Sequence, residues 1–211
     1  MVLELTSTMP DKREIVEKSA MVLARAFHDY PEYLYLFPDS RKREKKLFIL
    51  FKVMSRYCLE HGKVLATSPR LEGVLMYLPP PGDINGFDMV RCGALSIFFK
   101  LGIGFIKKQA RIIEVVVDAR KTHATMPHAY LFLLAVDPSF QGKGFAGQLV
   151  KHLTGMLDAS HLGCYLETSH AGNVDFYVHH GFELVETKDV PGTALTIRAL
   201  LRKPSGSTGK K

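Results

Sequence analysis

The segment Gln141–Gly147, QGKGFAG, contains three glycines and an alanine within seven residues. It follows the apolar run Tyr130–Val136 (YLFLLAV), typical of a central strand covered on both faces. It opens the segment Gly144–Ser160, whose apolar residues recur on one helical face. Because glycine has no Cβ, main-chain N–H groups of this loop can face an anion, and a helix N-terminus favours negative charge there. The sequence therefore predicts a strand, an anion-binding loop and a helix in succession.

A dinucleotide is one ligand that such a loop could bind, and the second motif described below points to another. The pattern G-x-G-x-x-G, with Glu167 about 20 residues after Gly147, is typical of a dinucleotide site. However, Asp137–Gln141 separates the strand from the first glycine, and the three short strands expected after the loop do not make a doubly wound sheet. A glycine-rich turn without a ligand is the remaining structural interpretation.

A second motif lies in Leu166–Glu186, LETSHAGNVDFYVHHGFELVE. The patterns V-D-P-x-x-Q-G-K-G-x-A-G and L-E-T-S-x-x-x-N-x-x-F-Y-x-x-x-G-F together resemble the pyrophosphate loop and the pantetheine-lining segment of the GNAT acetyltransferase superfamily. Ala26–Pro31 (AFHDYP) and Gly62-Lys63-Val64 make the chain look like the puromycin N-acetyltransferase-like branch. The resemblance implies an α/β (α+β) GNAT fold. Its central mixed, mostly antiparallel sheet of about seven strands is splayed between the fourth and fifth strands and flanked by helices.

The resemblance also implies a function. GNAT enzymes are N-acetyltransferases that use acetyl-CoA and transfer the acetyl group directly to an amine of a small molecule within a ternary complex. A module of the same fold that binds acyl-CoA without turnover, as a sensor, is the alternative. Matching positions imply that the cofactor contacts Leu134, Ala135, Val136, Gln141, Gly142, Lys143, Gly144, Phe145, Ala146, Gly147, His170, Asn173 and Tyr177. His170 stands where many relatives have an asparagine, and Asn173 either replaces that contact or simply begins a helix.

The catalytic residues implied by the resemblance are Tyr177 and Glu167. A phenol with a reference pKa of about 10 can protonate a departing thiolate, whereas a packed aromatic ring is the structural interpretation of Tyr177. Phe176 beside it is the better core candidate. An alkyl ammonium must lose a proton before it attacks, and Glu167, His128 or a water chain are the candidate bases. Structural interpretations are a hydrogen-bond acceptor for Glu167 and a surface position for His128.

The acceptor site is expected near the first helix and its loop, at Phe27, Asp29 and Tyr30, with His128 as a further candidate. We expect one domain over residues 1–203, with a helical insert at about 84–125 and a disordered tail at 204–211. The expected strands are Val2–Leu5, Lys63–Thr67, Glu72–Leu78, Tyr130–Val136, Cys164–Thr168, Phe182–Thr187 and Ala194–Leu201. The expected helices are Asp11–His28, ended by Pro31, Arg41–His61, two within 87–121 that break at Gly102 and Gly104, Gly144–Ser160 and Asn173–His180.

Composition limits the remaining functions. The chain has 211 residues, 46% of them hydrophobic, and a formal net charge of +7. Part of that charge lies in Arg41–Lys46 (RKREKK), interpreted as a solvated helix end, so we expect no nucleic-acid partner. The longest apolar run, Cys92–Ile106, is too short for a membrane span, and the three cysteines are too scattered for a disulfide framework or a zinc site. We expect a cytoplasmic protein without a metal, and the identity of the amine and the oligomeric state stay open, a homodimer included.

Overall fold

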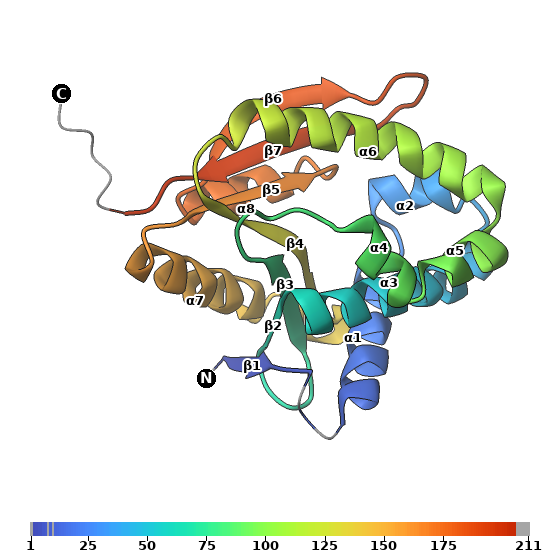
Figure 1. Cartoon of the computed structure of the whole chain (residues 1–211), viewed down its shortest axis with the longest axis horizontal. Helices are drawn as coiled ribbons and strands as arrows, with labels where there is room; N and C mark the ends of the chain where they lie inside the picture. Colours follow the sequence, from blue (N-terminus) through green and yellow to red (C-terminus); the bar gives the residue numbers. More distant parts are fainter. Residues whose placement is uncertain (1, 8, 10, 206–211) are drawn as a thin grey trace.

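The structure is a computed structural model that describes every residue except 1, 8, 10 and 206–211. Its centre is one seven-stranded sheet in the order β1-β2-β3-β4-β5-β7-β6 (Figure 1). Neighbouring strands are antiparallel, except for the parallel pair β4 and β5. The strands are β1 Leu3–Leu5, β2 Lys63–Ala66, β3 Gly73–Leu78, β4 His128–Val136, β5 Gly163–Thr168, β6 Glu183–Asp189 and β7 Thr196–Arg202. This arrangement confirms the mixed, mostly antiparallel sheet, and it excludes the doubly wound parallel sheet that a dinucleotide site requires.

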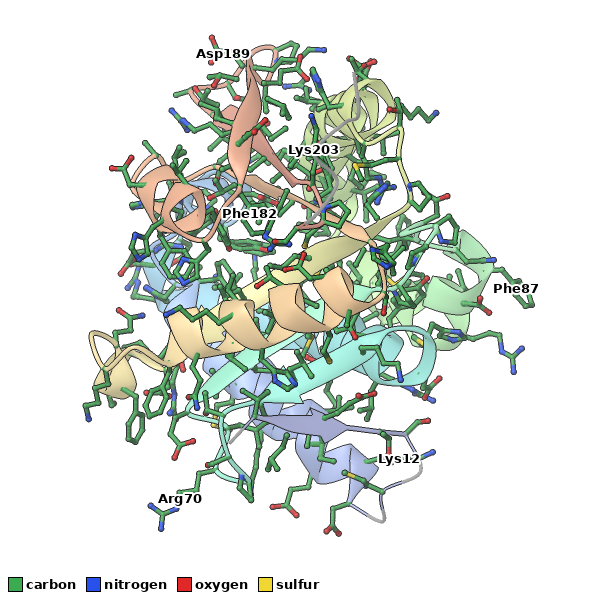
Figure 2. All side chains as sticks on the ribbon, turned by 90° about the vertical axis from the view of Figure 1, so that its left-hand side faces the viewer. Lys12, Arg70, Phe87, Phe182, Asp189 and Lys203 are labelled. Carbon is green, nitrogen blue, oxygen red and sulfur yellow. The ribbon has the colours of Figure 1, made fainter. Side chains whose placement is uncertain are left out.

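Helices cover both faces of the sheet and bury two apolar clusters. On one face, α1 (Lys12–Ala26), α3 (Ser40–His61) and α6 (Ile103–His123) pack over residues such as Met76 and Tyr165. On the other face, α7 (Phe145–Ala159) and α8 (Asn173–His179) pack over residues such as Leu131 and Leu166. Figure 2 shows α7 lying across the strands of this second face. The short helices α2 (Pro31–Leu36), α4 (Gly86–Arg91) and α5 (Ala94–Leu101) join the longer ones, and a 3-10 turn spans Pro138–Phe140.

The sheet opens between β4 and β5. Their pairing starts at His128 with Gly163 and ends at Tyr130 with Tyr165. Beyond that point β4 continues along β3 as far as Val136, while β5 continues along β7 as far as Thr168. The two strands therefore diverge, as expected, and the edge of β4 that faces β5 has no strand partner there. Phe132 is an extra residue in β4 relative to β3, a bulge of the kind that bends a strand beside a functional site.

Several predicted boundaries are wrong in a physically simple way. The first helix ends at Ala26, and Pro31 begins α2 instead of only ending the helix before it. Proline suits the first turn of a helix, because the N–H that it lacks would have no helical partner. The 87–121 region holds three helices, because Gly93, at φ 106°, interrupts it in addition to Gly102. Strand β4 starts at His128, two residues before the predicted start.

Two further predictions concern domain extent and membranes. The single domain over residues 1–203 stays a prediction, and most of the tail predicted at 204–211 lies outside the described residues. None of the helices in the described part of the chain is long and apolar enough to cross a membrane.

Candidate active site

The glycine-rich loop between β4 and α7 is shaped to receive an anion. Gly142 and Gly144 have φ of 75° and 80°, and a Cβ on either would meet no atom within 4 Å. Gly144 is the N-cap of α7, so the N–H groups of the first helical turn have no partner inside the helix. These N–H groups and the open space beside them form a cradle for a phosphate-type ligand.

Two side chains hold this loop in place. Asp137 accepts hydrogen bonds from the Ser139 N–H at 3.0 Å and from the Arg25 guanidinium at 3.2 Å. Burial raises the pKa of Asp137, but these donors outweigh it and the pKa lies below its usual value. Gln141 donates through Nε2 to the Val136 carbonyl at 3.2 Å. The loop is therefore fixed to α1 and to the end of β4, and the contribution of Arg25 was not predicted.

A cleft of about 550 Å³ connects this loop to the splay of the sheet. Of the thirteen cofactor-contacting residues expected from the sequence, all but Lys143 and His170 line it. The lining residues are Leu134, Ala135, Val136, Phe140, Gln141, Gly142, Gly144, Phe145, Ala146, Gly147, Asn173, Phe176 and Tyr177. The fold thus brings together two motifs that are separated in the sequence.

Lys143 and His170 lie outside this lining. Lys143 is exposed, with its ammonium 4.8 Å from the ring centre of Phe140. His170 is exposed and stacks on Tyr30, with ring centres 6.0 Å apart. Phe140 lines the cleft although the sequence analysis did not select it.

The burial of Phe176 and Tyr177 is the reverse of what the sequence predicts. Tyr177 is buried, at 7% exposure, and packs with Phe182 in the cluster beneath α7, whereas Phe176 is half-buried in the cleft wall. The prediction that Phe176 is the core residue was therefore wrong. Burial raises the pKa of the Tyr177 hydroxyl, with smaller effects from Tyr30 and Cys164. The phenol stays protonated at neutral pH and keeps a proton to donate.

A hydrogen-bonded network lies where β5 ends. The Tyr30 hydroxyl is 2.6 Å from the Thr168 hydroxyl and accepts from the Ser169 N–H at 3.1 Å. Asn173 donates through Nδ2 to the same Thr168 oxygen at 3.2 Å. Asn173 is also the first residue of α8, as one of the two alternatives expects, and its contact with the cofactor stays a prediction. Thr168 is a site residue that the sequence analysis missed, although it lies within the LETS motif.

Glu167 lies in the splay, two residues beyond the last β4–β5 pair. Its Oε1 atom is buried and has no hydrogen-bond partner among the described residues. Burial raises the pKa of this carboxyl group from 4.5 to about 7. The Tyr130 and Tyr165 hydroxyls and the charge of Arg120 lower the pKa in part, and the Glu32 carboxylate raises it further. A carboxyl group with such a pKa can exchange a proton near neutral pH.

The predicted acceptor residues do not all meet at the splay. His128 begins β4, about 20 Å of strand before Leu134. It is buried instead of lying on the surface, and its Nδ1 is 2.7 Å from the Met126 carbonyl oxygen. Phe27 packs against Tyr30, with ring centres 5.0 Å apart, and against Phe51 in the apolar cluster.

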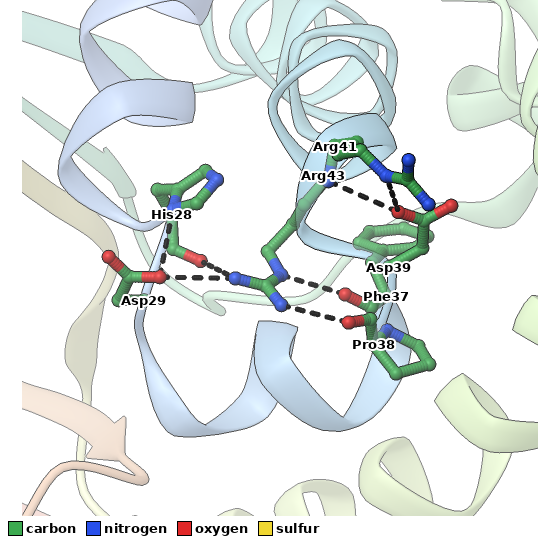
Figure 3. Close-up of polar contacts among 7 residues, drawn as sticks. All are labelled: His28, Asp29, Phe37, Pro38, Asp39, Arg41 and Arg43. Atoms are coloured by element: carbon green, nitrogen blue, oxygen red, sulfur yellow. Dashed lines mark hydrogen bonds and ion pairs between the residues drawn. The ribbon is translucent and has the colours of Figure 1, made fainter.

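Asp29 has a structural partner that the sequence did not reveal. Arg43 is 5% exposed and donates to Asp29 at 3.1 Å, to the Phe37 carbonyl at 2.7 Å and to the Pro38 carbonyl at 3.2 Å (Figure 3). The Asp29 carboxylate also lies 2.8 Å from His28 Nδ1. RKREKK is therefore not wholly a solvated helix end, because Arg43 fixes the loops on both sides of α2.

Another group of metal-ligating types lies away from the cleft. Glu60, His61 and Cys92 each place one ligand atom within 4.8 Å of the others. The Glu60 carboxylate accepts from Arg56 at 3.0 Å and from the Cys92 thiol at 3.6 Å. Protein contacts thus account for this carboxylate.

Comparisons with known proteins agree with this geometry. Residues 102–184 match the sequence profile of the acetyltransferase (GNAT) domain. The uncharacterized N-acetyltransferase C550.08 of Schizosaccharomyces pombe is 27% identical over 177 residues, which cover 79% of this chain and 70% of that protein. Residues 102–184 therefore match a GNAT acetyltransferase domain, and the similarity to a named N-acetyltransferase supports an acetyl-transferring enzyme.

Solved structures show the same fold. An acetyltransferase from Corynebacterium glutamicum, described with histone acetyltransferase HPA2, superimposes with a TM-score of 0.61 at 24% identity, covering 99% of both chains. The polyamine N-acetyltransferase of Drosophila melanogaster, which forms N-acetylagmatine, superimposes with a TM-score of 0.56 at 12% identity, covering 96% of this chain and all of that one. The narrower resemblance to the puromycin N-acetyltransferase-like branch stays a prediction.

The residues present fit the acetyl-CoA that this family uses. The open glycine cradle suits an anionic pyrophosphate, and the unpaired edge of β4 offers main-chain groups to the amides of an extended pantetheine arm. Phe140 and Phe176 supply apolar walls between these two places.

Proposed function

We propose that this enzyme transfers the acetyl group of acetyl-CoA directly to a primary amine of a small molecule, with both substrates bound at once. The observation that carries this proposal is the position of the cleft. It runs from the anion cradle to the splay of the sheet, with Tyr177 in its wall and Glu167 on the strand opposite β4. Acetyl-CoA, when bound, supplies an activated acyl carbon joined to a thiol leaving group.

The main chain of the site binds and orients the acyl donor. The N–H groups of Gly142–Gly147 would hold the pyrophosphate, and the edge of β4 at Leu134 and Ala135 would pair with the amides of the pantetheine arm. The Val136 carbonyl already accepts a hydrogen bond from the Gln141 side chain, so its role is to hold the loop in place.

Glu167 is the proposed general base. An acceptor amine is an ammonium ion at neutral pH and cannot attack until it loses a proton. A carboxylate with a pKa raised by burial to about 7 is basic enough to remove that proton near pH 7. The C–N bond then forms as the C–S bond breaks.

Tyr177 is the proposed general acid. Its buried hydroxyl keeps its proton, because burial raises the pKa, and the cleft brings it to the donor side of the splay. It gives this proton to the departing sulfur. The acceptor nitrogen loses two protons, because the ammonium gives one to Glu167 before attack and the newly acylated nitrogen gives the second to solvent. The returning proton passes from Glu167 to solvent and from solvent to Tyr177 between turnovers.

The two substrates approach from opposite faces of the sheet. Thr168 faces Asn173 and the cofactor cleft, whereas the preceding residue, Glu167, faces Tyr130 and Glu32 on the side of α2 and α6. Tyr30 reaches from the acceptor side to Thr168. This arrangement supports the proposed ternary complex, because neither substrate would have to leave before the other binds.

A thiol-release assay with acetyl-CoA and a panel of primary amines, alcohols and thiols tests this proposal. We expect release with amines and a product heavier by one acetyl group in mass spectra. Initial rates against both substrates should give intersecting double-reciprocal lines. Parallel lines would contradict the ternary complex, and acetyl-CoA binding without turnover on any acceptor would favour a sensor module.

A further inference from the structure

Polar side chains of β5 and of Ser169, which directly follows it, form a row without hydrogen-bond partners in the described part of the chain. Tyr165, Glu167 and Ser169 alternate along the chain and so point to the same side. The Tyr165 hydroxyl, Glu167 Oε1 and the Ser169 hydroxyl are each buried without a hydrogen-bond partner among the described residues. Tyr165 is 0% and Ser169 is 7% exposed. Because native proteins rarely leave buried polar atoms unpaired, this row indicates a ligand.

A second carboxylate faces this row from α2. Glu32, in the first turn of α2, is near enough to Glu167 for the two charges to repel each other. The Gln109 side chain, from α6, interacts favourably with the Glu32 carboxylate. Gln109 Oε1 is itself buried without a partner in the described part of the chain. Helices α2 and α6 are in contact, so the acceptor oxygens of Glu32 and Gln109 lie on neighbouring elements, and the charge of Glu32 acts on Glu167.

The surrounding side chains are aromatic. Tyr30 lies two residues before Glu32 and Tyr33 directly follows it. Burial raises the pKa of both hydroxyls, and the charge of Glu32 raises it further. Tyr130 and Tyr165 flank Glu167, and their ring centres are 6.2 Å apart. Arg120 already lies over the Tyr130 ring, 4.7 Å from its centre, and it donates to the Gly82 carbonyl at 2.8 Å and to Asp83 at 3.1 Å, so the other rings remain for a ligand. Aromatic faces beside acceptor groups favour an organic cation.

We propose that the acceptor carries two positive charges: its reactive amine lies at Glu167, and its second cationic group is bound by Glu32 and Gln109 at the α2–α6 contact. This inference rests on the proposed amine acetylation and narrows its substrate class to diamines and related dications. An ammonium or guanidinium group donates several hydrogen bonds and accepts none, and the carboxylates of Glu167 and Glu32 and the amide oxygen of Gln109 can accept them. The N-acetylagmatine formed by the Drosophila relative derives from such a dication.

The test compares α,ω-diamines of three to six carbons with n-alkylamines of the same length, in the wild type, Glu32→Gln and Gln109→Leu. The control is Glu14→Gln, which changes an exposed glutamate of α1. Assays at pH 8.5 lie well above the pKa of about 7 that burial gives Glu167, so an indirect effect of Glu32 on that carboxylate is small. Melting temperatures establish that each variant is folded.

We expect the wild type to prefer the best diamine over its monoamine by about 10- to 100-fold in kcat/KM, the worth of a charged hydrogen bond. Glu32→Gln should remove most of this preference and change monoamine rates less than threefold. Gln109→Leu should have a smaller effect of the same kind. Equal losses with diamines and monoamines, or no diamine preference in the wild type, would overturn the inference.

Calorimetry separates this inference from the proposed function. Binding of 1,4-diaminobutane to the CoA-saturated protein requires no turnover. If no amine is acetylated but the diamine binds to the wild type and to Glu14→Gln and not to Glu32→Gln, the dication site stands and the acetyl-transfer proposal falls. If the diamine does not bind to any of them, the dication site is wrong.

Discussion

Replacing Glu167 with glutamine should make the enzyme slower and, at alkaline pH, more stable. The two side chains have nearly the same shape, and the amide N–H groups can donate to the Tyr130 and Tyr165 hydroxyls. The change therefore removes a buried charge without leaving a cavity. Activity should fall about 10²- to 10⁴-fold if Glu167 is the general base.

The stability effect follows from the pKa of Glu167. Burial raises this pKa from 4.5 to about 7, so the folded protein holds a proton more tightly than the unfolded chain. The resulting stabilisation is complete below pH 4.5 and is lost as the pH rises through 7. A shift of this size corresponds to on the order of 3 kcal/mol. Glu167→Gln does not titrate, so its free energy of unfolding should fall less between pH 5 and pH 8, by up to that amount.

Urea unfolding at pH 5 and pH 8 measures the difference, and Glu183→Gln, at an exposed position of β6, is the matched control. We expect the control to follow the wild type at both pH values. Glu32, whose pKa burial also raises to about 7, leaves part of the pH dependence in Glu167→Gln. The same loss of stability in Glu167→Gln at both pH values would refute the argument, as would wild-type turnover at pH 8.

Three further changes test other parts of the site. Tyr177→Phe should lower the single-turnover rate about 10²- to 10⁴-fold with little change in the Kd for CoA, and a weaker CoA complex with an unchanged rate would mean that the ring only packs. Gly144→Glu, at φ 80° in the anion cradle, should abolish CoA binding measured by calorimetry, whereas Gly155→Glu, at an exposed position of the same helix, should not. Glu32→Gln should move the pH dependence of kcat/KM to lower pH, because the Glu32 charge raises the pKa of Glu167; an inflection that stays in place or rises would disprove this coupling.

Much of the fold is encoded locally and could be predicted from the sequence. The apolar run of β4, the glycines at the start of α7 and the alternation of later strands each depend on near neighbours in the chain. The family resemblance supplied the splay, which no local pattern shows. Errors came where two signals competed: Pro31 can follow one helix or begin the next, and Gly93 interrupts a segment that has helical periodicity on both sides.

The residues that line the cleft were easier to predict from the sequence than those of the proposed acceptor pocket. Loop contacts depend on main-chain geometry, which glycines reveal in a sequence. In contrast, Glu32 and Gln109 belong to elements 77 positions apart (109 − 32), and nothing near either residue indicates the other. Nothing near Arg43 in the sequence indicates its buried contacts with residues 28–38 either, because it belongs to a highly charged segment. Long-range pairing of polar groups has no periodic signature, so only the tertiary structure reveals it.

The unpaired polar groups of Tyr165, Glu167 and Ser169 destabilise the folded protein, and this destabilisation is explained if they bind a ligand. An unpaired buried polar atom costs roughly 1–3 kcal/mol, and the Tyr165 hydroxyl, Glu167 Oε1 and the Ser169 hydroxyl form such a row. A chain selected for stability alone would place apolar side chains here, as it does at Cys164 and Leu166 on the opposite face of β5. A bound cation supplies the missing hydrogen bonds and the opposite charge together. The acceptor should therefore stabilise the folded protein more at pH 8, where Glu167 and Glu32 are ionised, than at pH 5, and this difference should disappear when both are glutamine.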